Sequence, residues 1–184
     1  MAARRPVVIV DYDERWPRVF AALRDRAMPV VGDIALAIEH VGSTSVPGLA
    51  AKPIIDIDMV VPTPAALAEA ITRLATLGYR HAGDRGIEHR HGFHEPPEDP
   101  PHNLYVCLAG SRALRNHLAV RDHLQRHPED AAAYAVLKRR LATASRDDRR
   151  TYSAAKTDFI LGILEAEGIP AADRAAIRAE NRTV

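Results

Sequence analysis

Apolar positions follow two spacings along this chain, one typical of strands and one typical of helices. Short apolar runs predict strands at 7–10, 34–41, 54–61, 79–81, 86–93 and 102–109. Apolar residues three or four positions apart predict helices at about 14–30, 64–77, 112–125, 128–141 and 147–167. Asp13 and Ser111 can cap two of these helices. The order of elements predicts an α+β fold in which helices cover one face of a sheet.

The predicted elements divide the chain into a sheet part, at about 7–110, and a helical part, at about 111–167. Together they predict one domain over 1–169, because 184 residues comfortably form a single core. The last segment, 170–184, is charged, rich in alanine and poor in large apolar residues. We therefore expect it to be a loosely attached terminal helix or a frayed tail.

Composition narrows the class of protein only a little. The chain carries 25 basic and 24 acidic residues, so its overall charge does not favour long nucleic acids or a membrane surface. Cys107 is the only cysteine, which excludes an intramolecular disulfide and suits a reducing compartment. No apolar run is long enough to span a bilayer. These features predict a soluble, cytoplasmic protein.

Two acidic residues interrupt the apolar run at 54–61. Asp56 and Asp58 are two positions apart, so in a strand both side chains point to the same face. Neighbouring carboxylates in an apolar strand repel each other and are costly to desolvate unless a cation neutralises them. Carboxylate oxygens suit Mg²⁺ or Mn²⁺. The pattern predicts a metal site, although the same spacing also occurs at solvated strand ends.

A small-residue loop with several hydroxyl groups precedes these acids. It begins with Gly42 and Ser43 and continues with Thr44 and Ser45. Glycine lets a phosphate approach the backbone, and N–H and hydroxyl groups donate hydrogen bonds to phosphate oxygens. A Gly-Ser pair alone is also a common turn. Its combination with the two acids predicts a site for a nucleoside triphosphate.

The sequence around this loop resembles a known protein family. The phrases His-Val-Gly-Ser-Thr-Ser-Val-Pro-Gly at 40–48 and Lys-Pro-Ile-Ile-Asp at 52–56 are similar to the GrpB family, within the DNA polymerase β-type nucleotidyltransferase superfamily. The resemblance continues through 115–124 and through the Tyr and Lys pairs at 134/138 and 152/156. It implies a nucleotidyltransferase-like mixed β-sheet with flanking helices and a C-terminal helical bundle segment.

The resemblance also implies roles for individual residues. Asp56 and Asp58 would be the catalytic, metal-binding acids, and the substrate would be bound by Gly42, Ser43, Thr44, Ser45, Lys52, Arg90, Lys138, Tyr152 and Lys156. For Lys138 and Lys156, an alternative is that their stems cover apolar neighbours. Arg85 is an alternative to Arg90. His117 and Arg121 share a helix face and either contact phosphate or join a hydrogen-bonding set with Asp122.

The superfamily pattern includes a third metal-binding acid on a later strand. No acidic residue occurs at 102–109, so Glu88 and Glu95 are the possible substitutes. Several histidines lie at 81–102, but this stretch has no cysteine and contains a turn-rich Glu-Pro-Pro-Glu-Asp-Pro-Pro run, which disfavours structural zinc.

Three functional hypotheses remain open. The first is a metal-dependent nucleotidyltransferase that uses Mg²⁺ or Mn²⁺ and moves a nucleotidyl group from a nucleoside triphosphate to a small-molecule or protein acceptor. The second is a nucleotide-binding or accessory module of the same fold with little or no turnover. Domains resembling GrpB occur fused to dephospho-CoA kinase, so this module could be linked to coenzyme A metabolism. A histidine-based hydrolase has the least support.

Overall fold

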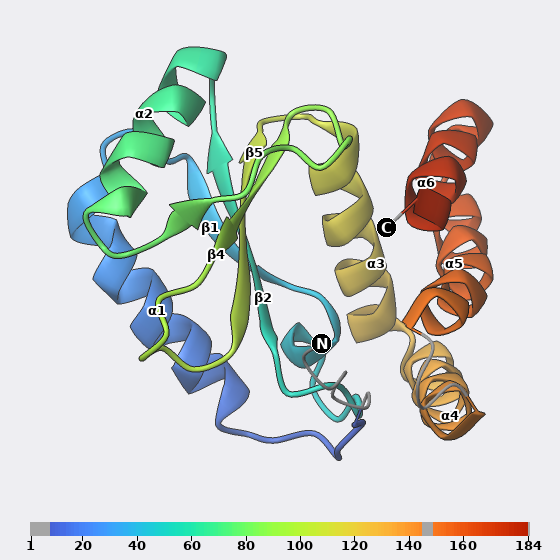
Figure 1. Ribbon diagram of the computed structural model, residues 1–184. Helices are drawn as coiled ribbons and strands as arrows, with labels where there is room; N and C mark the ends of the chain where they lie inside the picture. Colours follow the sequence, from blue (N-terminus) through green and yellow to red (C-terminus); the bar gives the residue numbers. More distant parts are fainter. Residues whose placement is uncertain (1–7, 145–148, 184) are drawn as a thin grey trace, which may run out of the picture.

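The computed structural model describes residues 8–144 and 149–183, and the side chains of 144, 149–155 and 181–183 are outside the description. Figure 1 shows the order of the elements along the chain. They are α1 (Trp16–Val31), β1 (Ala37–Val41), the 3₁₀ turn η1 (Ser43–Ser45), β2 (Ile55–Val61), α2 (Pro64–Ala75), β3 (Arg80–His81), β4 (Arg90–His94), β5 (His102–Leu108), α3 (Arg112–Arg126), α4 (Pro128–Ala144), α5 (Arg149–Ala166) and α6 (Ala171–Thr183).

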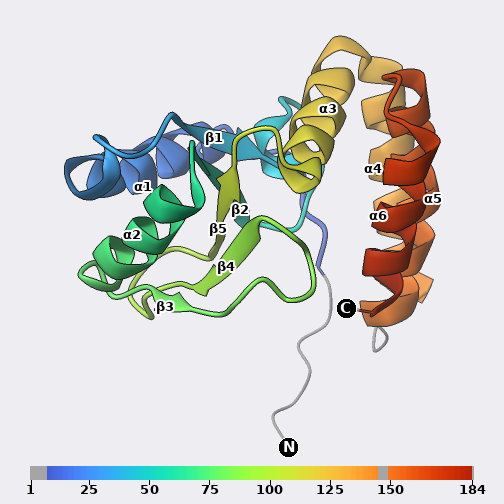
Figure 2. The ribbon, with the colours of Figure 1, turned by 90° about the horizontal axis from the view of Figure 1, so that it is seen from above.

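The strands form one mixed sheet in the order β1-β2-β5-β4-β3. The central strands β2 and β5 are parallel, and the other neighbouring pairs are antiparallel. Helices α1 and α2 lie on one face, α3 lies on the other, and α4, α5 and α6 stand beyond α3 (Figures 1 and 2). This confirms the predicted α+β class with flanking helices and a C-terminal helical segment. The expectation that helices cover only one face was wrong, because α3 packs against β1 and β5.

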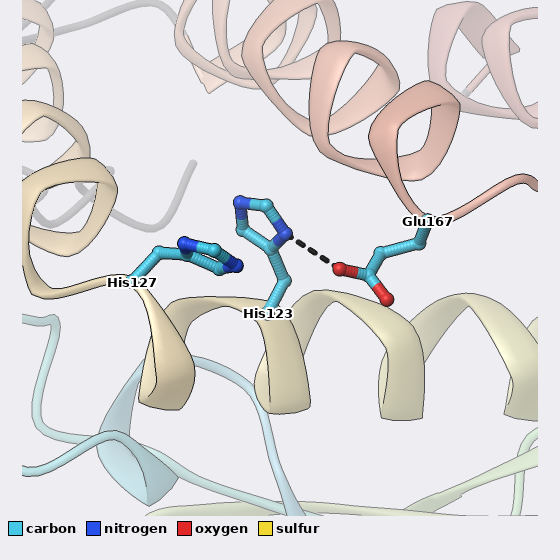
Figure 3. A group of neighbouring side chains, drawn as sticks. All are labelled: His123, His127 and Glu167. Atoms are coloured by element: carbon cyan, nitrogen blue, oxygen red, sulfur yellow. Dashed lines mark hydrogen bonds and ion pairs between the residues drawn. The ribbon is translucent and has the colours of Figure 1, made fainter.

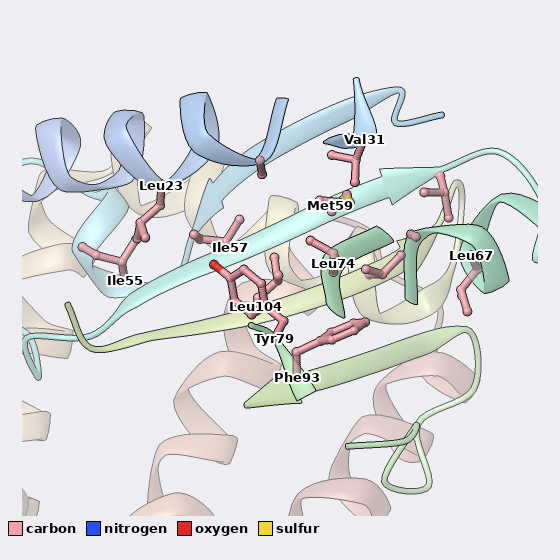
Figure 4. Close-up of a cluster of buried hydrophobic side chains, with 14 of the residues drawn as sticks. Leu23, Val31, Ile55, Ile57, Met59, Leu67, Leu74, Tyr79, Phe93 and Leu104 are labelled. Atoms are coloured by element: carbon pink, nitrogen blue, oxygen red, sulfur yellow. The ribbon is translucent and has the colours of Figure 1, made fainter. Parts of the chain in front are cut away.

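The main core lies between the sheet and the pair α1 and α2 (Figure 4). Alternate residues of β2 point into it, so Ile57, Met59 and Val61 are almost completely buried. Thr63 starts α2 by accepting a hydrogen bond from Ala66 N–H, and Ser111 starts α3 by accepting one from Leu114 N–H. The cap predicted at Ser111 is therefore confirmed.

Two predictions near the N-terminus need correction. The strand expected at 7–10 is reduced, within the described residues, to one antiparallel bridge between Val10 and Ala51. Asp13 does not cap α1, because its carboxylate accepts hydrogen bonds from the backbone and guanidinium of Arg15 and the helix begins at Trp16.

The C-terminal segment packs more closely than expected for a frayed tail. It forms α6, whose Ile177 is 3% exposed and contacts Leu161 and Leu164 of α5. Ion pairs join Arg112 and Arg115 of α3 to acidic residues of α6. In the described part of the chain, no helix combines the length and apolar character needed to cross a bilayer.

Candidate functional site

The two aspartates of β2 lie on the face of the sheet that α3 covers. Because side chains alternate along a strand, the core-facing Ile57 and Met59 leave Asp56 and Asp58 on the opposite face. Asp58 is fully buried. The predicted placement of both carboxylates on one face is therefore confirmed.

Asp58 is paired with a histidine from α3. Its Oδ2 lies 2.7 Å from His117 Nδ1. Burial lowers the pKa of His117, but the charge and hydrogen bond of Asp58 outweigh burial, so the pKa lies above its ordinary value. The second oxygen, Asp58 Oδ1, is buried and has no hydrogen-bond partner among the described residues. It is an acceptor that a cation or a donor on a ligand can satisfy.

Asp56 is bonded to the neighbouring strand. The parallel pairing places Asn103 of β5 opposite Asp56, and Asn103 Nδ2 donates to Asp56 Oδ1 over 2.7 Å. Burial raises the pKa of Asp56, although the Asn103 hydrogen bond opposes the rise. An amide therefore lies beside this pair on β5, a strand that contains no acidic residue.

The Gly-Ser turn lies directly against Asp56. Gly42 has φ +71° and ψ −172°, a conformation that is nearly restricted to glycine. A Cβ at Gly42 would overlap Asp56 Oδ2. Ser45 Oγ donates to Gly42 O over 2.6 Å, which holds the turn closed. Glycine at this position thus permits both the turn and its contact with the acid.

The hydroxyl of Thr44, between Ser43 and Ser45 in this loop, points inward. Thr44 is buried, and its Oγ1 lies 3.0 Å from His40 Nε2 and donates to Ile54 O over 3.3 Å. His40 stacks on Phe20, and burial, with the charge of Arg121, lowers its pKa to about 4. A neutral His40 and Thr44 therefore connect the loop to the start of β2.

A pocket of about 230 Å³ opens between the turn, β2 and the helices. Its polar lining comes from Gly42, Ser43, Asp56, Asn116, His117, Arg121 and Lys156. Its apolar wall comes from Val120, Leu124, Tyr134 and Ile160. Small-ligand clefts usually measure about 300–1,000 Å³, so this pocket suits a small ligand or part of a nucleotide. A lining that combines cationic and apolar side chains matches an anion with a less polar portion.

Two cations from different helices reach the pocket. Arg121 of α3 donates to Glu39 Oε2 over 2.7 Å and to His40 O over 3.2 Å, which joins α3 to β1. Lys156 of α5 also lines the pocket. Lys138 of α4 lies behind them, 2% exposed, with its Nζ 4.5 Å from the centroid of the Tyr134 ring.

Lys138 is an unusual buried cation. No described side chain or backbone oxygen accepts a hydrogen bond from its Nζ. Burial, with the charges of Lys156 and Arg139, lowers its pKa to about 7. A nearby anion would therefore favour the protonated form of Lys138.

The remaining predicted residues are spread around this centre. The guanidinium of Arg90, on β4, stacks over Tyr105, which pairs with Asp58 in the sheet. Lys52 precedes β2 and does not line the pocket. The backbone of Tyr152 belongs to α5, but its side chain lies outside the described residues. The proposed substitutes for a third acid, Glu88 and Glu95, are both exposed and do not line the pocket.

Asn103, Asn116 and Tyr134 were not predicted as site residues from the sequence. Asn103 had an available signal, because it begins the polar face of an alternating strand that continues with Tyr105. Its pairing with Asp56, 47 positions earlier, depends on the parallel register of β2 and β5. His117 and Arg121 were recognised as sharing a face, and the structure brings both to the acids and the loop.

A comparison with protein families matches most of the chain. The family model described as GrpB protein matches residues 6–166. UPF0157 protein YqkA of Bacillus subtilis (strain 168) is 36% identical over 157 residues, which cover 85% of this chain and 46% of that protein. Dephospho-CoA kinase of Mycolicibacterium paratuberculosis (strain ATCC BAA-968 / K-10) is 28% identical over 179 residues, with coverage of 84% and 44%. The chain thus spans about half the length of these relatives.

A solved structure supports the same fold over the full relative. The crystal structure of conserved protein GrpB from Enterococcus faecalis superposes with a TM-score of 0.78 at 30% identity. The match covers 88% of this chain and 97% of that chain. The sheet and the helical segment of the present chain are therefore found together in this relative.

Proposed function

Since this chain belongs to the GrpB family, we propose that it binds a nucleoside triphosphate between β2 and α3 and transfers its nucleotidyl group to a small-molecule or protein acceptor. The observation that carries the proposal is the contact between the Gly42 turn and Asp56, beside the buried Asp58. A turn that binds phosphate and an acidic pair that binds a metal ion can together hold one nucleoside triphosphate.

The residues present fit a Mg²⁺ or Mn²⁺ ion. Asp58 Oδ1 is buried and lacks a hydrogen-bond partner among the described residues, and Asp56 supplies further carboxylate oxygen on the same face. Hard oxygen donors suit either ion. Asp56 and Asp58 would hold the ion, which when bound would neutralise charge on the triphosphate. Asn103 and His117 would orient the two carboxylates.

The other pocket residues would bind the rest of the nucleotide. Ser43 and the turn would hold phosphate oxygens, and Arg121 and Lys156 would balance their charge. Tyr134, Leu124 and Ile160 would contact the less polar nucleoside. During transfer, an acceptor oxygen attacks the α-phosphorus and pyrophosphate leaves with the electron pair of the broken bond.

One observation favours a second candidate function. Strand β5 carries Asn103 beside Asp56 and has no acidic residue, and the two acidic substitutes, Glu88 and Glu95, are exposed. The site could therefore bind nucleotide without turnover and act as an accessory module. The similarity to a dephospho-CoA kinase makes coenzyme A metabolism one setting for such a module.

Calorimetric titration with ATP, GTP, CTP and UTP, each with and without Mg²⁺, tests these functions. The transferase predicts metal-dependent binding of at least one triphosphate, and pyrophosphate release once an acceptor is supplied. Asp56→Asn should abolish both, whereas Asp158→Asn, at an exposed site on α5, should change neither. Binding without pyrophosphate release across small-molecule and protein acceptors supports the module. Binding that does not depend on the metal contradicts the transferase, and absence of any triphosphate binding contradicts both functions.

A further inference from the structure

A second cluster of ionisable side chains lies where α3, α4 and α5 meet, apart from the nucleotide pocket. His123 belongs to α3, His127 ends that helix, and Glu167 directly follows α5 (Figure 3). Each offers one ligand atom, and the three atoms lie within 4.8 Å of one another. None of these residues lines the nucleotide pocket. The proposed transfer reaction gives this cluster no role.

His123 occupies the centre of the cluster. Its side chain is 7% exposed, its Nδ1 lies 2.7 Å from Glu167 Oε1, and its Nε2 lies 2.8 Å from Asp130 Oδ2. The ring of His127 stacks against it with centroids 4.3 Å apart. His127 also lies within reach of Glu129, with 3.4 Å between Nδ1 and Oε1. Two imidazoles and three carboxylates therefore converge from separate parts of the chain.

The charges of the cluster leave a place for a cation. Glu129, Asp130 and Glu167 are acidic, and Arg126 neutralises Glu167 only through its other oxygen, Oε2. Both ring nitrogens of His123 face carboxylates, Nδ1 towards Glu167 and Nε2 towards Asp130. A divalent ion can lie between His123 Nδ1 and Glu167 while the Nε2–H group donates to Asp130. Histidines that bind metals commonly donate their other N–H to a carboxylate in this way.

We propose that this cluster binds one divalent transition-metal ion of the Zn²⁺ class, with His123, His127 and Glu167 as ligands. Imidazole nitrogens with a carboxylate oxygen are a common donor set for Zn²⁺. Water or Glu129 completes the coordination. Ligand atoms on a tetrahedral zinc lie about 3.3–3.5 Å apart, so the His123–Glu167 contact opens slightly on binding. The ion joins the ends of α3 and α5 and thereby fixes helices that line the nucleotide pocket.

The test is calorimetric titration of the chelator-treated full chain with ZnCl₂. We expect one Zn²⁺ per chain and at least tenfold weaker binding in His127→Asn. This variant leaves the contacts of His123 with Glu167 and Asp130 intact, so the fold should persist, as circular dichroism can verify. The matched control is His89→Asn, which removes an exposed histidine that likewise lies beside a glutamate. Asn tolerates the positive φ of His89.

A second readout is stability. Because an ion that binds only the folded chain stabilises it, saturating Zn²⁺ should raise the urea midpoint of the wild type and of His89→Asn but not that of His127→Asn. With excess Mg²⁺ in both solutions to occupy Asp56 and Asp58, Asp56→Asn should bind Zn²⁺ like the wild type, so this result is independent of the proposed transferase. No stoichiometric Zn²⁺ binding, or equal affinities of His127→Asn and His89→Asn, would overturn the proposal.

Discussion

Gly42 illustrates how one residue can set the geometry of the site. Its backbone conformation and the closeness of Asp56 both exclude a side chain. We expect Gly42→Ala to lower the free energy of unfolding by about 3 kcal/mol, since backbone strain alone costs about 1–3 kcal/mol. Nucleotide affinity should fall more than tenfold. Urea denaturation and calorimetric titration measure the two effects.

Gly48 provides the control for this prediction. It has a similar positive φ of +78°, but a Cβ there would meet nothing within 4 Å. Gly48→Ala should therefore cost only about 1–2 kcal/mol from the backbone conformation, with nucleotide affinity preserved. Equal effects of the two substitutions on nucleotide affinity would contradict the role given to the contact between Gly42 and Asp56.

Lys138 differs from Gly42 because its buried side chain lowers the stability of the folded protein. The folded protein lowers its pKa from 10.5 to about 7, so the unfolded chain binds more protons between these values. The cost is therefore complete below pH 7 and declines as the pH rises toward 10.5. Such a cost is understandable if the lysine serves an anionic ligand.

We expect Lys138→Met to raise the free energy of unfolding by about 2 kcal/mol at pH 6, because it removes the buried charge. The gain should be about 2 kcal/mol smaller at pH 9, where the folded wild type carries a neutral lysine. Arg140→Met, at an exposed position of the same helix, should change the value by less than about 0.5 kcal/mol. Urea denaturation at both pH values measures this difference. A rise in the free energy of unfolding that does not vary with pH would contradict this explanation.

The local sequence pattern predicted the elements that depend mainly on residues close together in the chain. Strand β2 alternates apolar and acidic residues over 55–58, and α2 and α3 have caps that can be recognised from single residues. The strand expected at 34–41 shortens to Ala37–Val41, because Ile34 and Ala35 bond back to the end of α1. The partners of β2 could not be predicted from local spacing. The contact of Asn103 with Asp56 depends on strand pairing across 47 positions.

The attachment of α6 can be tested through Ile177. This side chain is 3% exposed between Leu161 and Leu164. Ile177→Ala should lower the free energy of unfolding by about 2–4 kcal/mol, the usual cost of truncating a buried isoleucine. Val136→Ala, at a position of α4 that is 66% exposed, should change it by less than about 0.5 kcal/mol. A similarly small effect of Ile177→Ala, measured by urea denaturation, would show that α6 adds little to stability.

The site lies between two layers of the molecule, the sheet and the C-terminal helices, which follow one another in the chain. The sheet supplies the acids and the Gly42 turn, and α3, α4 and α5 supply the cations and the apolar wall. The expectation of a sheet part followed by a helical part describes these layers. It contained no information on how they meet, because that depends on contacts such as Arg121 with Glu39, 82 positions apart.

The loss of Arg121 should affect both stability and triphosphate binding more than the loss of an ordinary surface arginine does. Its side chain is 18% exposed and joins α3 to Glu39 and to the carbonyl of His40. Arg121→Ala should lower the free energy of unfolding by about 1–3 kcal/mol, because charged hydrogen bonds in a partly buried site are lost. Arg121→Lys should recover only part of the lost stability, since lysine lacks the planar fork of donors.

The control is Arg178→Ala, which breaks an exposed pair with Asp158. It should lower the free energy of unfolding by less than about 1 kcal/mol and leave triphosphate affinity unchanged. If Arg121→Ala weakens binding no more than Arg178→Ala does, Arg121 only joins the two layers and does not contact the ligand.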